Sequence, residues 1–282
     1  MPSSRVYLEI TNCCNLACSF CPGTTRRAAF LTVAQFTHLA GALRGQTRFL
    51  YFHVMGEPLL HPDLPELLDI AGRMGFRVVL TTNGTLLPKR QRELLAAQAL
   101  HKVSVSLHSF EANSGVDMEH YLAGCTDFGL AASEAGILID YRLWNLDGAE
   151  TRGRNEQNDA ILNHLHAAYP GNWTQNTWGW RLCDRTFIHY GEKFDWPSPD
   201  APDHGEAGTC RALRDQLAVL CDGTVVPCCL DGEGRIPLGN LLAQPLDEIL
   251  AAEPARSIAA GFALQKRLHP LCRRCGYAQR FR

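Results

Sequence analysis

The chain has 282 residues, of which 46% are hydrophobic and 20% charged, and its formal net charge is −2. This is an ordinary globular composition with enough apolar side chains for a sizeable core, and nothing in the charge calls for nucleic acid or an anionic membrane as a partner. No apolar run is long enough to span a bilayer and the N-terminus lacks the layout of a signal peptide, so we expect a cytoplasmic protein.

Strand-like and helix-like segments alternate through the first two thirds of the chain. Strands are predicted over residues 6–11, 48–54, 77–82, 102–107 and 137–144, with a sixth near 182–189. Apolar residues at helical spacing predict a helix after each of the first five, and Thr32 and Gln35 form a capping-box pattern before the first helix. Such alternation predicts an α/β fold with a parallel sheet and outer helices, and five or six units could close into all or part of a barrel.

The composition changes after residue 190. Residues 191–209 contain three prolines, several aspartates and three glycines, which indicates a linker. In the segment that follows, Asp222-Gly223 predicts a hairpin between 217–220 and 224–226, and helical turns are expected near 246–252 and 255–262. The predicted domains are therefore 1–190, a linker over 191–209, and a small cysteine-rich unit over 210–282.

Twelve cysteines are present, and most of them are clustered, which in a reducing cytosol favours metal binding or catalysis over disulfides. Cys14, Cys18 and Cys21 have the spacing C-x3-C-x2-C. A [4Fe–4S] cluster normally takes four thiolates, so three leave one iron open to another ligand. The alternative is zinc, for which three cysteines alone are an incomplete structural site.

With Phe20 before its last cysteine, this motif resembles the signature of the radical S-adenosylmethionine (SAM) superfamily. In that family the open iron binds SAM, and reduction of the cluster cleaves SAM to a 5′-deoxyadenosyl radical, which abstracts hydrogen from a substrate. The resemblance implies a partial (β/α)6, TIM-like barrel, in agreement with the alternation of strands and helices.

The same resemblance assigns further residues to SAM. Gly56, Glu57 and Pro58 match a turn that hydrogen-bonds the SAM amino group, Asn83 lies in a matching turn after the third strand, and Ser106 matches a ribose contact. Arg142 matches a contact to the SAM carboxylate, and Phe20 matches the aromatic residue whose backbone lies near adenine. All of these residues fall at or near the C-terminal ends of predicted strands, which share the active face of a parallel barrel.

A second set of cysteines lies in the tail. Cys210 and Cys228 are separated by the predicted hairpin, and Cys272 and Cys275 form a C-x2-C pair. Four thiolates close a site, and they suit an iron–sulfur cluster or zinc. The layout resembles the twitch domain, a shortened SPASM extension of some radical SAM enzymes, and implies one auxiliary iron–sulfur cluster of the [4Fe–4S] type.

Four further residues keep several interpretations. Cys13 adjoins Cys14 and is the less favoured first ligand, because it would leave a four-residue gap to Cys18. Cys221 and Cys229 are substitute ligands, buried thiols or reactive thiols. His108 stands where many relatives have aspartate, which reflects either substrate choice or an ordinary histidine at a loop edge.

The predicted function is that of a radical SAM enzyme acting on a small molecule or a peptide by dehydrogenation, epimerisation or peptide modification. The alternative is a non-catalytic metal-binding or redox-sensing protein on a degenerate barrel. The basic residues near the C-terminus would either dock an electron donor of the flavodoxin or ferredoxin type or form a solvated basic tail.

Overall fold

The computed structural model describes residues 5–113, 115–146 and 156–281. Its strands are β1 (Arg5–Leu8), β2 (Phe49–Tyr51), β3 (Arg77–Thr82), β4 (Leu100–Ser106), β5 (Leu138–Leu146), β6 (Thr174–Asn176), β7 (Gly179–Cys183), β8 (Thr186–Glu192), β9 (Gln216–Val219), β10 (Thr224–Val226) and β11 (Gly239–Asn240). Its α-helices are α1 (Val33–Leu43), α2 (Leu64–Arg73), α3 (Leu87–Ala96), α4 (Met118–Glu134), α5 (Glu156–Ala168), α6 (Leu246–Ala251), α7 (Ala255–Ala263) and α8 (Pro270–Arg273). Three 3-10 helices are η1 (Pro58–Leu60), η2 (Leu107–Ala112) and η3 (Gly276–Arg280).

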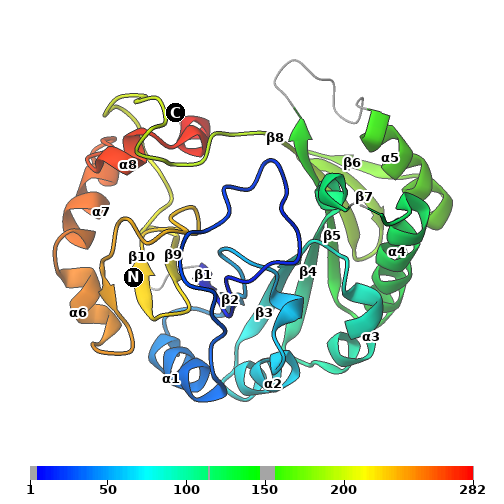
Figure 1. The fold of residues 1–282 in the computed structure, drawn as a ribbon, viewed down its shortest axis with the longest axis horizontal. Coiled ribbons are helices and arrows are strands. Elements are labelled where there is room, and N and C mark those ends of the chain that lie inside the picture. The colour runs from blue at the N-terminus through cyan, green and yellow to red at the C-terminus, as the bar shows by residue number, and fades with distance from the viewer. Residues whose placement is uncertain (1–4, 114, 147–155, 282) are drawn as a thin grey trace.

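The strands form one curved sheet in the order β11-β10-β9-β1-β2-β3-β4-β5-β8-β7-β6, with helices around its outer side (Figure 1). From β9 to β8 every neighbouring pair is parallel, whereas β10, β11, β7 and β6 are added antiparallel at the two ends. This arrangement confirms the predicted α/β fold of a partial, TIM-like barrel.

The sixth predicted strand was placed incorrectly. Residues 182–189 include the end of β7, a turn at Asp184 and Arg185, and the start of β8. Of these two strands, β8 pairs parallel with β5, whereas β7 pairs antiparallel with β8. The residues on both sides of the turn have strand-like composition, so the sequence pattern did not separate the two strands.

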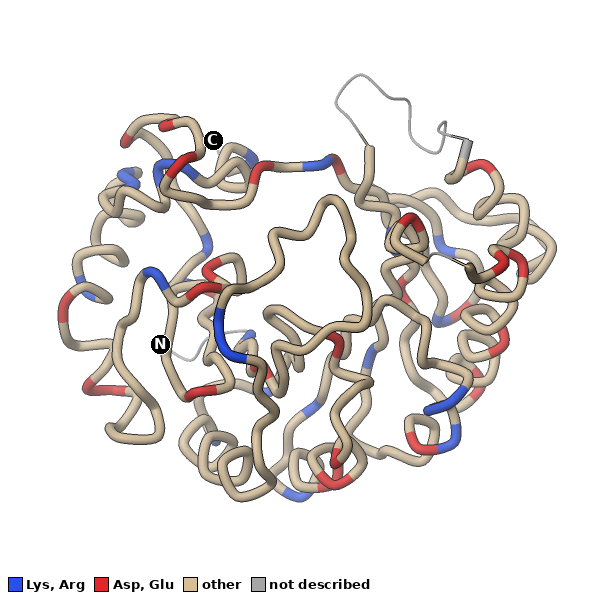
Figure 2. Tube along the Cα trace, in the orientation of Figure 1, with Lys and Arg blue, Asp and Glu red and all other residues tan. Residues whose placement is uncertain are grey.

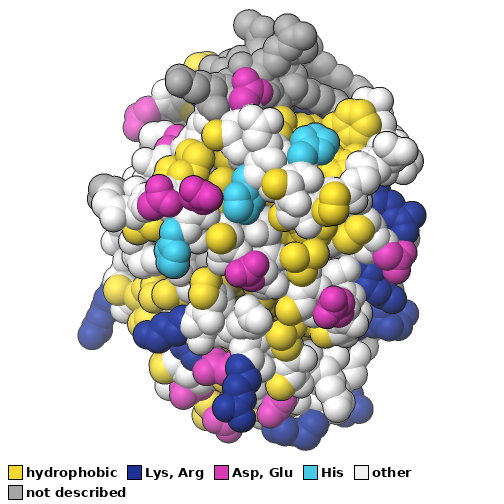
Figure 3. Space-filling model, turned by 90° about the vertical axis from the view of Figure 1, so that its right-hand side faces the viewer, with side chains coloured by type: hydrophobic (Ala, Val, Ile, Leu, Met, Phe, Trp, Pro, Cys, Tyr) yellow, Lys and Arg dark blue, Asp and Glu magenta, His cyan; other side chains and the backbone are white. Residues whose placement is uncertain are grey.

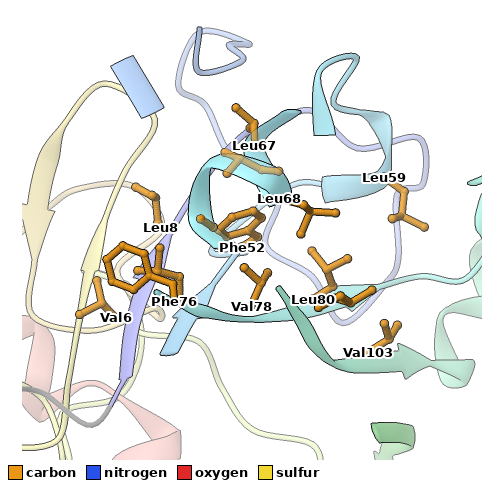
Figure 4. Close-up of a cluster of buried hydrophobic side chains, with 14 of the residues drawn as sticks. Val6, Leu8, Phe52, Leu59, Leu67, Leu68, Phe76, Val78, Leu80 and Val103 are labelled. Carbon is orange, nitrogen blue, oxygen red and sulfur yellow. The ribbon is translucent and has the colours of Figure 1, made fainter. Parts of the chain in front are cut away.

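The main core lies between the outer face of the sheet and the helices (Figure 4). Val78, Leu80 and Val103 point from the strands toward Leu67 and Leu68 of α2, and all five side chains are buried. The predicted capping box at the start of α1 is present and fixes where that helix begins. Burial of the apolar faces of the helices on this side leaves the opposite face of the sheet free for other residues.

The inner face of the sheet is polar. The register places Thr81, Ser104 and Asp140 side by side on β3, β4 and β5, and Tyr7 beside Tyr51 on β1 and β2. A face packed only against apolar neighbours would be a continuous hydrophobic surface, so this composition indicates a face that binds polar groups.

The tail continues the sheet. The predicted hairpin is confirmed by the antiparallel pairing of β9 with β10, and β9 also pairs parallel with β1, from Arg5↔Gln216 to Leu8↔Val219. The division of the chain into separate domains at 190 and 210 remains a prediction, because this strand joins the two predicted units.

None of the helices in the described residues is long and apolar enough to cross a bilayer. Acidic and basic residues are both spread around the outer elements (Figure 2). On the face seen in Figure 3, apolar side chains are interspersed with acidic and histidine side chains, and no one kind covers the whole face.

Candidate functional site

Cys14, Cys18 and Cys21 lie on the irregular segment that follows β1. Cys14 and Cys21 are exposed and Cys18 is half-buried. The amide of Cys21 donates to the carbonyl of Cys18 at 3.1 Å, which holds these two cysteines in one tight turn. Burial, together with electrostatic repulsion from the neighbouring Cys14 and Cys21 sulfurs, raises the pKa of Cys18 to about 12. The three thiols are therefore neighbours on one loop with an open side.

The Gly56-Glu57-Pro58 turn packs directly beneath this loop. The Glu57 amide donates to the Cys13 carbonyl at 2.7 Å. Gly56 has φ +75°, and a Cβ added there would lie 2.6 Å from the Thr11 carbonyl oxygen, so only glycine allows this approach. Pro58 is buried at the start of η1. The turn predicted after the second strand thus supports the backbone of the cysteine loop.

Glu57 and Asn83 connect the cysteine loop to the end of β3. The Glu57 carboxylate, which is only 2% exposed, accepts from the Asn83 amide at 2.7 Å and from the Leu59 amide at 3.0 Å. Burial outweighs these hydrogen bonds and raises the pKa of Glu57 to about 7. The Asn83 side chain donates to Asn15 at 2.9 Å and lies 4.0 Å from the Cys14 sulfur. The structure therefore brings Cys14, Glu57 and Asn83 together.

His108 contacts the cysteine loop through the ring of Phe20. Their ring centroids are 4.6 Å apart. His108 Nδ1 lies 3.0 Å from the Arg142 carbonyl oxygen, and burial lowers the pKa of His108 to about 4. A neutral ring hydrogen-bonded to the backbone favours a supporting role for His108 at this edge.

Ser106 and Arg142 are paired in the register of β4 and β5. The Ser106 carbonyl accepts from the Ser109 hydroxyl at 2.6 Å. The Arg142 guanidinium lies over the Trp144 ring at 4.7 Å, with its Nε 3.6 Å from an Asp140 carboxylate oxygen. Arg142 therefore belongs to the polar inner face of the sheet, and in the described part of the chain no hydrogen bond joins its guanidinium to the cysteine loop.

Cys13 differs from its neighbour Cys14 in the direction of its side chain. Its sulfur lies 3.9 Å from the Ala29 carbonyl oxygen, and its amide donates to the Thr11 hydroxyl at 3.0 Å. Cys13 is therefore engaged with Thr11 and Ala29, which favours Cys14 over Cys13 as the first ligand.

The four predicted ligands of the tail line one pocket. Cys210, Cys228, Cys272 and Cys275 come from three separate segments of the tail and meet there with apolar side chains. Burial, with electrostatic repulsion from the neighbouring Cys210 and Cys275 sulfurs, raises the pKa of Cys272 to about 12. Thiols this protonated need a cation to become thiolates, which is the chemistry that an iron or zinc centre provides.

Cys221 and Cys229 are absent from the lining of that pocket. Cys221 is buried, and its sulfur accepts from Arg26 at 3.7 Å. Cys229 is half-buried and adjoins Tyr7 on the inner side of β1, where burial raises the pKa of Cys229 to about 11. Neither position supports a substitute ligand of the four-cysteine pocket.

Both cysteine groups offer the number of thiolates that an iron–sulfur cluster can use. In the described ranges, no three His, Cys, Asp or Glu side chains are placed to hold one metal ion. Each thiolate of an iron–sulfur cluster binds its own iron, so the thiols need only surround a common space. Three thiols on one loop, two of them exposed and one half-buried, and four thiols around one pocket meet that requirement.

The sequence interpretation missed a group of charges centred on Asp140. This carboxylate is 3% exposed and lies 2.7 Å from Lys102 Nζ and 2.6 Å from His189 Nδ1. Burial alone would raise the pKa of Asp140, but the hydrogen bond from His189 and the charges of Arg142 and Lys102 lower it below its usual value. The sequence did carry a signal for this group, because Asp140 is an acidic residue inside an apolar strand pattern.

A second missed group joins the cysteine loop to the tail. Glu9 is fully buried and binds Arg26 through two hydrogen bonds of 2.8 and 2.6 Å. Glu9 also accepts from the amides of Met55 and Cys221, while Arg26 donates to the Gly232 carbonyl at 2.7 Å. One ion pair therefore connects β1, the cysteine loop, the Gly56 turn and the tail.

The basic residues of the tail are largely occupied by the linker. Arg267 is 2% exposed and donates to the Ala207 carbonyl, and Arg273 pairs with Asp203. Arg280 donates to the Glu192 carbonyl and stacks on Tyr277. This pairing leaves less free positive charge for docking an acidic protein than the sequence suggested.

Comparison with known proteins identifies both parts of the chain. Residues 8–124 match the model of the Radical SAM superfamily, and residues 210–276 match the SPASM model, described as an iron–sulfur cluster-binding domain. Such domains hold a [4Fe–4S] cluster with SAM and an auxiliary iron–sulfur cluster, respectively. The predicted family resemblance and cofactors are thereby confirmed.

Individual relatives match over part of their length. The chain is 30% identical over 146 residues to the tungsten-containing aldehyde ferredoxin oxidoreductase cofactor-modifying protein of Pyrococcus furiosus, covering 49% of this chain and 38% of that protein. It is 34% identical over 114 residues to the PqqA peptide cyclase of Streptomyces rochei, covering 39% and 31%. The crystal structure of BtrN in complex with AdoMet and 2-DOIA has a TM-score of 0.61 at 18% identity, covering 97% of this chain and 92% of that one, and it shares the fold.

Proposed function

We propose that this chain, which combines a radical SAM domain with a SPASM domain, starts a radical reaction at Cys14, Cys18 and Cys21 and completes it with the help of the cluster in its tail. The carrying observation is the convergence of the three cysteines with the Gly56 turn and Asn83 at one end of the barrel. When bound there, the cluster and SAM supply a 5′-deoxyadenosyl radical that abstracts hydrogen from a substrate.

The protein residues would position SAM rather than react. The Gly56-Glu57-Pro58 turn holds the backbone beneath the cysteine loop, and Asn83 is fixed by Glu57 beside Cys14. Ser106 and Arg142 lie next to each other on β4 and β5. We assign the SAM amino group to the Gly56 turn with Asn83, the ribose to Ser106, the carboxylate to Arg142 and the adenine to the backbone of Phe20.

Cys210, Cys228, Cys272 and Cys275 would hold the auxiliary cluster. Their pocket supplies four thiols, so every iron of a [4Fe–4S] cluster can receive a protein ligand, and zinc is the competing occupant. A closed cluster suits electron transfer better than SAM cleavage. It would accept or return an electron during the reaction.

The substrate is a small molecule or a peptide. One curated relative is named as a peptide cyclase, and BtrN, which shares the fold, is described with the small molecule 2-DOIA. The reaction is a dehydrogenation, an epimerisation or a peptide modification. We place the protein in the cytoplasm with a flavodoxin- or ferredoxin-type electron donor, because reduced clusters need such a partner.

The experiment compares the wild type with a Cys14→Ala/Cys18→Ala/Cys21→Ala variant. Both are purified without oxygen and reconstituted, and iron, sulfide and reductive SAM cleavage are measured. We expect about eight irons per wild-type chain and about four in the variant. 5′-Deoxyadenosine should form only with the wild type.

Two other results would contradict parts of the proposal. About four irons with SAM cleavage intact would mean that the tail holds zinc or nothing, and the role of the auxiliary cluster would be wrong. A fully loaded and reduced protein that does not cleave SAM would leave the non-catalytic redox or metal-binding protein as the better interpretation.

A further inference from the structure

Two consecutive residues of the linker contact both predicted cluster loops. Trp196 Nε1 donates to the Phe20 carbonyl at 2.9 Å, and Phe20 is bonded to Cys21. The amide of Gly276, which is bonded to Cys275, donates to the Asp195 carbonyl at 3.0 Å. Residues 195–196 thus link the two sites. They are hydrogen-bonded on one side to the neighbour of Cys21 and on the other side to the neighbour of Cys275.

The contact on the tail side depends on a glycine. A Cβ added at Gly276 would lie 2.9 Å from both the nitrogen and the oxygen of Asp195, so a larger residue could not approach as closely. The next linker residue, Pro197, lines the four-cysteine pocket itself. The linker therefore runs against the second site over several residues.

Aromatic packing fixes the residues that make the two hydrogen bonds. The Phe194 ring lies 5.4 Å from the Trp196 ring and 5.0 Å from the Tyr277 ring. The Arg280 guanidinium stands over Phe194 at 5.5 Å and over Tyr277 at 4.8 Å. A packed segment with hydrogen bonds at both ends transmits a displacement that a solvated linker would absorb.

We propose that Trp196 is a positioning residue that couples the two sites, so that SAM binding at the first changes the auxiliary cluster at the second. This inference rests on the proposed function, because it requires a cluster in each loop. SAM binding moves or stiffens the loop that ends at Cys21, and the Phe20–Trp196 hydrogen bond passes that change to Gly276 and Cys275. By linkage, reduction of the auxiliary cluster changes the affinity for SAM by the same factor.

The test uses a variant that removes only the hydrogen bond. Trp196→Phe keeps an aromatic ring against Phe194 and loses the indole N–H. Trp173→Phe is the matched control, because Trp173 is also half-buried and donates its indole N–H to a backbone carbonyl, that of Tyr169, at 3.0 Å. Trp173 lies between α5 and β6, where its ring stacks on His166 of α5.

The measurement is a redox titration of the auxiliary cluster, followed by electron paramagnetic resonance, with and without SAM. We expect SAM to shift the midpoint potential in the wild type and in Trp173→Phe, and to shift it by less than half as much in Trp196→Phe. A wild type without a SAM-dependent shift, or a Trp196→Phe protein with the full shift, would overturn the proposal.

A second measurement needs no variant, in case Trp196→Phe does not fold or hold iron. Hydrogen–deuterium exchange of the reconstituted wild type is followed in peptides covering residues 270–280. SAM should slow exchange at Gly276, and unchanged exchange there would count against the coupling. Iron content and SAM cleavage are measured first, since a protein with both clusters and active cleavage but no coupling rejects only this inference.

Discussion

Gly56 shows how strongly a single residue constrains the site, because its turn combines a left-handed backbone with direct contact to the cysteine loop. Gly56→Ala should cost more than about 2 kcal/mol and lower the iron content of the first site, since the strain of the left-handed conformation adds to a clash with Thr11. Denaturant unfolding and iron analysis measure both effects.

Gly75→Ala separates the two causes. Gly75 also has a positive φ of +86°, but a Cβ there would meet nothing within 4 Å. This variant should lose about 1–2 kcal/mol and keep its iron. Equal losses of stability and iron in the two variants would show that the contact with the cysteine loop is unimportant.

His53, on the inner face of the sheet, should make stability depend on pH. Burial and the nearby charge of Arg142 lower the pKa of His53 to about 3, so the folded protein keeps this ring neutral. Below pH 6.5 the unfolded chain takes up a proton at His53 and the folded chain does not. Stability is therefore lost as the pH falls from about 6.5 toward 3, by at most about 1.4 kcal/mol per pH unit from this residue.

Urea unfolding at several values between pH 7.5 and 5.5 tests this contribution. His53→Gln should flatten the acid side of the profile, because glutamine does not titrate. His38→Gln, on the exposed side of α1, is the control. A His53→Gln profile parallel to that of the wild type would contradict the effect.

The sequence predicted the cysteines more readily than the residues that hold them. The spacing of Cys14, Cys18 and Cys21 is local, so it is visible in the chain itself. Glu9 and Trp196 act on partners far away in sequence, at Cys221 and Phe20, and no local pattern reports such contacts. Glu9 still carried a signal, because a carboxylate inside an apolar strand requires a buried partner.

At the level of elements, the Glu9–Arg26 ion pair joins the end of β1 to the cysteine loop, the Gly56 turn and the tail. Arg26→Met should cost about 3–5 kcal/mol, because it leaves the fully buried Glu9 without its partner. The double variant Glu9→Gln/Arg26→Met should recover part of that loss. Thermal and urea unfolding of the single and double variants measure the coupling.

An exposed ion pair provides the comparison. Arg181 and Asp184 lie 2.6 Å apart, with side chains 48% and 81% exposed. Arg181→Met should change stability by less than about 1 kcal/mol. If Arg26→Met were no more destabilising than Arg181→Met, the buried pair would not hold the tail against the cysteine loop.

Most of the elements could be predicted because each carries its own pattern. The first five strands alternate with helices of clear apolar spacing, and the capping box marks the start of α1. The β7–β8 hairpin was missed, since its short turn at Asp184 and Arg185 has none of the Asn-Gly type of signal that identified the turn at Asp222-Gly223.

For the molecule as a whole, the tail should be required for the barrel to fold. Deletion of residues 210–282 removes β9 and exposes the edge of β1 together with the apolar residues that Ala218 and Leu220 cover. We expect the shortened chain to aggregate or to lose its secondary structure. Size-exclusion chromatography and circular dichroism measure the outcome.

The full-length Cys210→Ser/Cys228→Ser/Cys272→Ser/Cys275→Ser variant is the matched control. It keeps β9 in the sheet and removes only the predicted ligands, so it should retain the secondary structure while losing the tail's iron. A shortened chain that stays monodisperse and folded would instead support the separation of domains that the sequence suggested.

The continuity of the sheet was the least predictable property of the molecule. Linker-like composition indicated a boundary, and β9 contains only four residues, too few to reveal which strand it joins. Two parallel strands are not joined by a short turn, and no fixed number of residues separates them in the sequence. The pairing of β1 with β9 was therefore visible only in the structure.

That partnership also sets an order of events during synthesis. The ribosome makes β1 and the cysteine loop well before β9 and before Gly232, whose carbonyl accepts from Arg26. Until then β1 lacks a neighbour on one side and the loop lacks its hydrogen bond to Gly232, so the sheet stays incomplete until β9 has emerged. Iron should therefore be inserted only after β9 has been made, and any factor that delivers it would meet a chain that already includes this strand.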